Sequence, residues 1–169
     1  PFTVDGTALA PVAVSGGSSA VSVPDLPAGT VEVTAAYSGD GYYAPASAGP
    51  LSHQVDRAAT DTSLAVSPSA SVTGQSVTLT AAVSSTATPP LAGTVTFSVD
   101  GAPVGTATLS GGLATLQWTP AMPGDVTVTA AYDGNAGFAP SVSDGFIHST
   151  GPAATDITLS GPVSVAAGQ

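Results

Sequence analysis

Two histidines are the side chains of this sequence best suited to acid–base chemistry near neutral pH. They are His53 and His148, which lie 95 residues apart. Serine is abundant, so a Ser–His–Asp arrangement is a candidate for nucleophilic catalysis. However, the sequence has no nucleophile elbow or comparable local signature that would set a serine beside either histidine. We therefore predict that the protein is not an enzyme and has no catalytic residue.

Aspartates near candidate domain joints form the second group, because Ca²⁺ takes about six to eight oxygen ligands, several of them from carboxylates. No Asp-x-Asp-x-Asp run is present, and each joint offers only two or three acids. Turn formation and solvated strand entrances are the preferred interpretation. We predict no cofactor, and calcium at the domain joints is the alternative. The aspartates concerned are Asp56, Asp61 and Asp156, with Asp40 and Asp133 in nearby loops.

An aromatic loop provides the candidate binding surface. The segments Asp40–Tyr43 and Asn135–Phe138 correspond to each other, and each precedes a final strand. Binding residues are often carried on loops, and exposed aromatic rings can stack on sugars. Tyr42, Tyr43 and Phe138 are therefore candidate ligand contacts. The preferred interpretation, however, is that Tyr43 and Phe138 pack beneath the loop or against the next domain. Tyr42 aligns with a glycine and is the better candidate for exposure.

The overall charge excludes several classes of partner. The formal net charge is −10, and Arg57 is the only basic residue among Lys and Arg. Nucleic acids and anionic membrane surfaces are bound through clusters of Lys and Arg, so we predict neither partner. No run of about 18 apolar residues is present, so we predict no membrane insertion in this segment. Because the segment has no Cys and no Lys, disulfides and Lys–Asn isopeptide bonds are excluded.

The chain repeats itself without a gap at an offset of 95 residues. Residues 2–55 and 97–150 are identical at 18 of 54 aligned positions, and the matches gather at Gly, Tyr and Pro. Thr155, Asp156 and Leu159 match Thr60, Asp61 and Leu64 at the same offset, which indicates that a further repeat begins there. We expect the C-terminal part of one repeat over residues 1–58, a complete repeat over 59–153 and the start of another over 154–169. The chain is expected to be a window on a longer array.

Every element of the repeat has the pattern of a β-strand. Apolar and polar residues alternate with a period of two, which is typical of antiparallel strands with one polar face. Turn residues such as Asp100-Gly101 and Asp133-Gly134 separate the strands. About seven short strands per repeat predict an all-β sandwich of two antiparallel sheets. The alternating runs are residues 76–83, 94–99, 114–118 and 125–132.

These strands must position the residues named above. Tyr37 and Tyr132 each lie in the penultimate strand of their repeat, where a tyrosine can hydrogen-bond back across the corner as a structural element. Trp118 aligns with a valine in the earlier copy, which indicates core filling. His53 and His148 fall at equivalent places in final strands roughly 40 Å apart, so they cannot share a ligand.

Several segments of the repeat form a specific signature. They are Thr94–Phe97, Asp100-Gly101, Gly105–Ala107, Gly112–Leu116 and Val128–Gly134, with Ala35–Tyr43 in the earlier copy. On these segments the chain resembles the bacterial immunoglobulin-like domains of the Big family, group 3 type. The resemblance covers nearly the whole chain and is most specific where a tyrosine is followed by a glycine after the penultimate strand. It implies an immunoglobulin-like β-sandwich without family-wide catalytic residues.

From this resemblance we expect an extracellular or bacterial cell-surface location and a non-catalytic role as a spacer or adhesin stalk. The expected partners are neighbouring repeats of the same chain. Two alternatives remain: a glycan- or protein-binding adhesion module, and an extracellular filament subunit completed by strand exchange.

Overall fold

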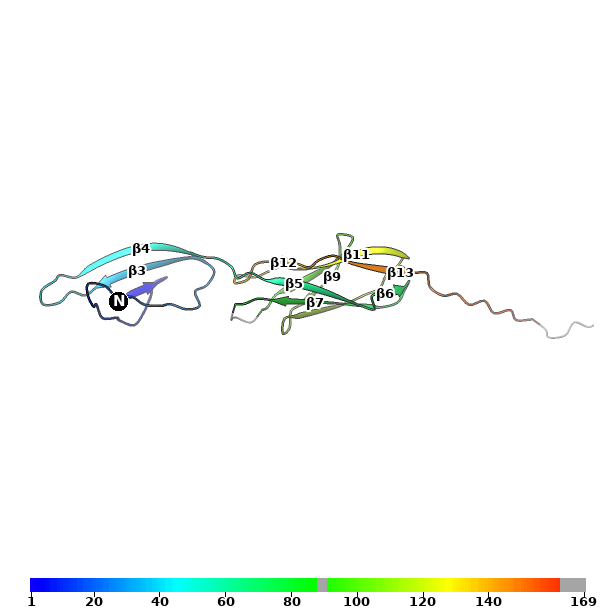
Figure 1. The fold of residues 1–169 in the computed structure, drawn as a ribbon, viewed down its shortest axis with the longest axis horizontal. Helices are drawn as coiled ribbons and strands as arrows, with labels where there is room; N and C mark the ends of the chain where they lie inside the picture. Colours follow the sequence, from blue (N-terminus) through cyan, green and yellow to red (C-terminus); the bar gives the residue numbers. More distant parts are fainter. Residues whose placement is uncertain (88–90, 162–169) are drawn as a thin grey trace, which may run out of the picture.

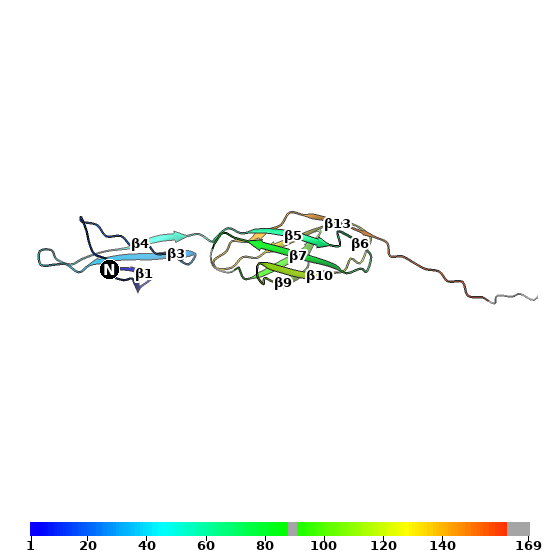
Figure 2. The same cartoon turned by 60° about the horizontal axis from the view of Figure 1, so that its bottom comes forward.

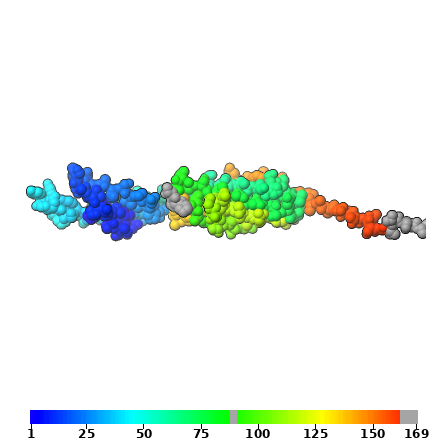
Figure 3. Space-filling model, turned by 90° about the horizontal axis from the view of Figure 1, so that it is seen from below, coloured from blue at the N-terminus to red at the C-terminus, as the bar shows by residue number. Residues whose placement is uncertain are grey.

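The computed structural model describes residues 1–87 and 91–161, which form strands and loops without a helix. None of these residues therefore forms a helix that could cross a membrane. Two β-structured regions lie end to end along one long axis, and an extended tail leaves the second region (Figures 1 and 3). The strands of the first region are β1 (Phe2–Val4), β2 (Thr7–Ala8), β3 (Gly29–Tyr37) and β4 (Ala46–Val55).

The second region is a two-layer sandwich built from nine strands (Figure 2). One sheet has the order β10-β7-β5, and the other has the order β6-β13-β11-β8-β9, with β12 also paired to β11. The predicted all-β sandwich fold is confirmed here. The strands are β5 (Asp61–Ser67), β6 (Ala70–Val72), β7 (Val77–Ser84), β8 (Thr94–Val99), β9 (Ala102–Thr108), β10 (Leu113–Trp118), β11 (Gly124–Tyr132), β12 (Ser141–Val142) and β13 (Phe146–Gly151).

Alternation along the strands builds the core of this sandwich. In β7, burial alternates strictly from Val77 to Val83, because successive side chains point to opposite faces of a sheet. Phe97 of β8 and Val128 of β11 meet them from the other sheet, and both are fully buried. The remaining buried core members are Val66, Leu79, Ala81, Val95, Leu109, Ala114, Ala130, Tyr132 and Phe138.

The chain crosses from one sheet of the sandwich to the other between β5 and β6. β5 pairs antiparallel with β7, whereas β6, which follows it, pairs in parallel with β13 on the opposite sheet. The parallel ladder joins Ser149 to Ala70 and Gly151 to Val72. The two layers are therefore connected through one continuous stretch of chain at the edge of the sandwich.

The first region contains one sheet, of order β2-β1-β3-β4. Shifted by 95 residues, β1 falls on β8, β3 falls on β11, and β4 falls on β12 and β13. The register is kept as well, since Val4 pairs with Val33 just as Val99 pairs with Val128. Among the described residues, Val31 is the only buried apolar side chain of this region. The first region therefore contains the counterpart of one sheet of the sandwich, and its described residues form no second sheet to cover it.

An Asp-Gly turn fixes the same hairpin in both repeats. Asp5 and Asp100 have φ values of 45° and 48°, in the left-handed region that aspartate tolerates better than most residues. The Oδ1 atom of Asp5 accepts a hydrogen bond from the Glu32 N–H, and Asp100 Oδ1 accepts one from the Thr127 N–H, both at 2.8 Å. This turn chemistry explains why the strand register repeats.

The tail after β13 is extended and exposed over residues 152–161. Ile157 and Leu159 project from it with almost their whole side chains in solvent. The start of a further repeat was predicted over residues 154–169, of which residues 162–169 lie outside the described part of the chain. That prediction, like the other repeat boundaries, stays a prediction.

Candidate functional site

The loop over residues 133–140 is organised by one side chain. Asn135 Oδ1 accepts hydrogen bonds from the N–H groups of Gly137 and Phe138, at 2.8 and 3.0 Å. Its Nδ2 atom donates to the carbonyl of Ala92, also at 2.8 Å. Gly134 has a φ of 74°, and a Cβ atom there would lie 2.8 Å from the Phe138 carbonyl oxygen. The tight turn after β11 therefore requires glycine followed by a side chain that caps backbone amides.

The equivalent loop, over residues 38–45, uses a carboxylate in the same place. Asp40 Oδ1 accepts hydrogen bonds from the N–H groups of Tyr42 and Tyr43, both at 2.8 Å. Asp40 Oδ2 accepts a hydrogen bond from the Tyr37 hydroxyl at 2.8 Å. The Tyr42 N–H, followed by the Tyr37 hydroxyl and the Tyr43 N–H, holds the pKa of Asp40 below its ordinary value. The carboxylate in turn raises the pKa of Tyr37, because it stabilises the protonated phenol.

The two predicted corner tyrosines make different hydrogen bonds. The Tyr132 hydroxyl donates to the Ala92 carbonyl at 2.8 Å, tying the end of β11 to the chain that enters β8. Burial raises the pKa of Tyr132, since the charged phenolate would be poorly solvated. Tyr37 instead donates to Asp40 within its own loop. In the complete sandwich the hydroxyl ties together segments 40 residues apart, whereas in the single sheet it stabilises a local turn.

The three candidate ligand contacts divide into two groups. Tyr42 and Tyr43 are 95% and 70% exposed, respectively. Phe138, which aligns with Tyr43, is 3% exposed and belongs to the core, so it presents no ring to a ligand. Ala58 and Ala87 pack against this core. Burial of Phe138 thus depends on segments that are distant in the sequence and have no described counterpart beside Tyr43.

Ala58 closes the loop that carries Phe138. The Ala58 N–H donates to the Gly137 carbonyl, and the Ala139 N–H donates to the Ala58 carbonyl, each at 2.9 Å. Next to this parallel bridge, the Thr60 hydroxyl donates to the Ala139 carbonyl at 2.8 Å. The residues entering the second repeat are therefore fixed to its 133–140 loop by three hydrogen bonds, which we call the entry clamp.

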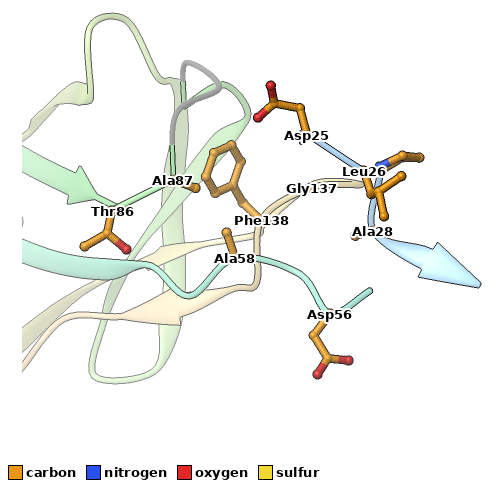
Figure 4. A pocket seen from close by; sticks show the side chains of 10 residues that line it. Asp25, Leu26, Ala28, Asp56, Ala58, Thr86, Ala87, Gly137 and Phe138 are labelled. Carbon is orange, nitrogen blue, oxygen red and sulfur yellow. The ribbon is translucent and has the colours of Figure 1, made fainter. Parts of the chain in front are cut away.

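A shallow hollow lies between the two repeats (Figure 4). Asp25 and Leu26 line it from the first repeat, and Ala87 and Phe138 line it from the second. Asp56 also lines it, from the connecting segment. In residues 1–87 and 91–161, no three His, Cys, Asp or Glu side chains come close enough to hold a metal ion. Calcium at the domain joints therefore stays an untested alternative.

The two histidines occupy equivalent strands but different environments. His53 is exposed on β4, whereas His148 of β13 has no solvent-accessible surface. His148 Nε2 lies 2.9 Å from the Ser71 hydroxyl, and its ring meets Trp118 edge-on at 5.5 Å. Sequence reasoning missed this cluster because Ser71 lies 77 residues away and no local pattern links it to the histidine. Enclosed in this way, His148 is a packing residue.

Two solved structures are similar to this chain. A CARDB domain from Pyrococcus furiosus, solved in complex with di-metal ions, is similar at 16% identity and a TM-score of 0.42, over 56% of this chain and 93% of that chain. Fibronectin(III)-like modules of Clostridium thermocellum CbhA are similar at 16% identity and a TM-score of 0.44, over 80% of this chain and 69% of that chain. No curated protein matches the sequence.

The sequence model of the bacterial Ig-like domain (group 3) matches residues 1–56 and again residues 64–150. These two matches coincide with the single sheet and with the sandwich. The chain therefore belongs to the bacterial Ig-like domain (group 3) family.

Proposed function

We propose that this chain is a non-catalytic spacer: part of an extracellular or cell-surface array that holds a distal module away from its anchor. The observation that carries the proposal is the entry clamp. β4 ends at Val55 and Ala58 is already bonded to the second repeat, so only Asp56 and Arg57 separate the two repeats. A connection of two residues restricts bending between repeats, because so little unpaired chain is available to change direction.

The surface of the chain supports the same role. A net charge of −10 with a single Arg disfavours binding to anionic surfaces. Ser and Thr fill the outward-facing positions of several strands, such as Ser63, Thr78 and Thr80. A surface of this kind keeps the array dissolved without creating charged sites that attract unrelated partners.

Distance measurements between two spin labels test the spacer. The chain contains no cysteine, so Ser47→Cys and Ser149→Cys introduce the only labelling sites, one on an exposed position of each repeat. A spacer predicts one narrow distance distribution. A matched variant with Gly-Ser-Gly-Ser inserted between Asp56 and Arg57 should broaden it, because the repeats then gain a flexible connection. Equally broad distributions in both proteins would refute the spacer.

A second candidate function is glycan or protein binding through the exposed rings of Tyr42 and Tyr43. Their exposure at the far end of the first repeat favours it, because large apolar rings left in solvent often serve recognition. Glycan arrays and pull-down experiments with the parent chain and Tyr42→Ala test this function. Binding by the parent chain that is lost in Tyr42→Ala would support a recognition function. If the parent chain bound no glycan or protein on broad panels, the recognition function would be contradicted and the spacer proposal would stand.

A further inference from the structure

The connection between the two repeats contains the only Lys or Arg of the sequence. Arg57 is exposed and follows Asp56, directly after β4 ends at Val55. Exposed connecting segments are preferred sites of proteolysis. Proteases of the trypsin type cut after a basic residue, because an acidic pocket of the protease binds its side chain. The bond between Arg57 and Ala58 is therefore the one bond of this sequence that such a protease recognises.

The entry clamp holds the residue that follows this bond. The Ala58 N–H and carbonyl are both hydrogen-bonded to the 133–140 loop, at 2.9 Å. The Thr60 hydroxyl donates to the Ala139 carbonyl and lies 2.8 Å from the Ser141 hydroxyl. A bound segment that adds to a partner as an extended strand must pair its own backbone groups with that partner. Because the backbone groups of Ala58 are already bonded, a protease can bind this segment only after the clamp opens.

The peptide connection is what joins the two repeats. In the part of the chain that the structure describes, each hydrogen bond lies either within residues 1–55 or within residues 58–151. The strands of the sandwich begin at Asp61, so they all follow the Arg57–Ala58 bond. One cut at this bond therefore leaves the sandwich complete, and no described hydrogen bond then holds the first repeat to it.

We propose that the Arg57–Ala58 bond is a release site, which a trypsin-like protease hydrolyses when the entry clamp opens. In the overall reaction one water molecule is consumed. The water oxygen adds to the Arg57 carbonyl carbon, and the C–N bond to Ala58 breaks. The products are the Arg57 carboxylate and the Ala58 ammonium group. The clamp thus sets the rate at which the two repeats separate. This role goes beyond that of a spacer and does not depend on it.

Trypsin digestion of the parent chain and of a free peptide tests the proposal. The peptide has the sequence of residues 52–62, so it contains the same bond and the same neighbouring acids but no clamp. We expect the peptide to be cut roughly a hundredfold faster, because three hydrogen bonds must break before the folded chain is cut. Mass spectrometry should identify residues 1–57 and 58–169 as the products of the parent chain. A parent chain cut as fast as the peptide would overturn the proposal.

A matched pair of variants tests whether the clamp controls the cleavage rate. Thr60→Ala removes the hydroxyl that contacts Ala139 and Ser141, and it should raise the rate by about fivefold. Thr115→Ala makes the same chemical change at an exposed position of β10, and it should leave the rate unchanged. No acceleration by Thr60→Ala, or an equal acceleration by Thr115→Ala, would contradict control by the clamp.

Hydrogen exchange of the Ala58 amide measures clamp opening independently, since this N–H donates to the Gly137 carbonyl. In the parent chain we expect it to exchange faster than the amide of Leu79, which lies in the core strand β7, because the clamp opens without unfolding of the sandwich. Thr60→Ala should speed exchange at Ala58 by the same factor as cleavage. Exchange at Ala58 as slow as at Leu79, or exchange that does not follow the cleavage rate, would overturn the proposal.

Discussion

The two repeats of this chain share strand register and turn chemistry but not a hydrophobic core. Both have the Asp-Gly hairpin turn and the capped loop after the penultimate strand. In the sandwich, however, the second sheet buries Phe97 and His148 completely, whereas Phe2 is partly exposed and His53 is exposed. Local turns and alternation therefore set how one sheet is paired, and the opposing sheet decides which of its residues become core.

The largest expected difference between the repeats concerns their aligned phenylalanines. Phe97→Ala removes a fully buried ring and should lower the free energy of unfolding by about 3–5 kcal/mol. Phe2→Ala removes a partly exposed ring from a single sheet and should have a much smaller effect. Urea unfolding followed by fluorescence of Trp118, the only tryptophan, reports on the sandwich. Equal shifts of that transition in the two variants would contradict the comparison.

The aligned histidines provide the second comparison. His148→Ala should destabilise the sandwich by about 2–4 kcal/mol, because it leaves a cavity beside Trp118 and removes the hydrogen-bond partner of Ser71. His53→Ala changes an exposed position and should stay within about 0.5 kcal/mol of the parent. Differential scanning calorimetry measures both. If His53→Ala strongly lowered the free energy of unfolding, the His53 side chain would have to make packing contacts in the single sheet that its exposure does not indicate.

Exchanging the capping side chains between the loops should give a smaller effect. Asn135→Asp keeps the Oδ1 cap but replaces the Nδ2 donor to Ala92 with an acceptor, and it should cost about 1–3 kcal/mol. In the first repeat, Asp40→Asn keeps the cap but removes a charge and the acceptor of the Tyr37 hydroxyl. Both changes are local to the first repeat, so the sandwich transition should not move. Urea unfolding monitored at Trp118 distinguishes them. If Asn135→Asp left the free energy of unfolding unchanged, the Tyr132 hydroxyl alone would be sufficient to hold the Ala92 carbonyl.

The smallest expected effect is an acid-sensitive loop in the first repeat only. Because the folded-state pKa of Asp40 is lowered, its stabilisation is complete above the unfolded value of about 3.9 and is lost as pH falls through the folded-state pKa. The amide signals of Tyr42 and Tyr43 should report this in an NMR acid titration. Asp40→Asn should abolish the change, and the signals of Gly137 and Phe138 should not show it. Persistence of the change in Asp40→Asn would disprove the assignment.

The features that could be predicted from the sequence, the strands and the hairpin turns, depend on residues that are close together in the chain. Alternation located the strands, and the Asp-Gly pairs located the hairpins, because both effects act over a few residues. Phe138 could not be assigned from the sequence, since its burial is completed by Ala58 and Ala87, which lie 80 and 51 residues away. The contact between Ser71 and His148 depends in the same way on the pairing of β6 with β13. Local patterns carry no information on which distant segment will cover a given side chain.

The parallel pairing of β6 with β13 has a consequence for how the sandwich responds to a pulling force. The chain enters the sandwich at one end, through Ala58, and leaves it at the other, through Gly151. A pull on these two ends therefore draws β6 and β13 in opposite directions along their length. The ladder from Ala70 to Val72 is then loaded in shear, so its hydrogen bonds resist together rather than one after another. Ser71 and His148, bonded across this ladder, add a side-chain link at the place where the load is carried.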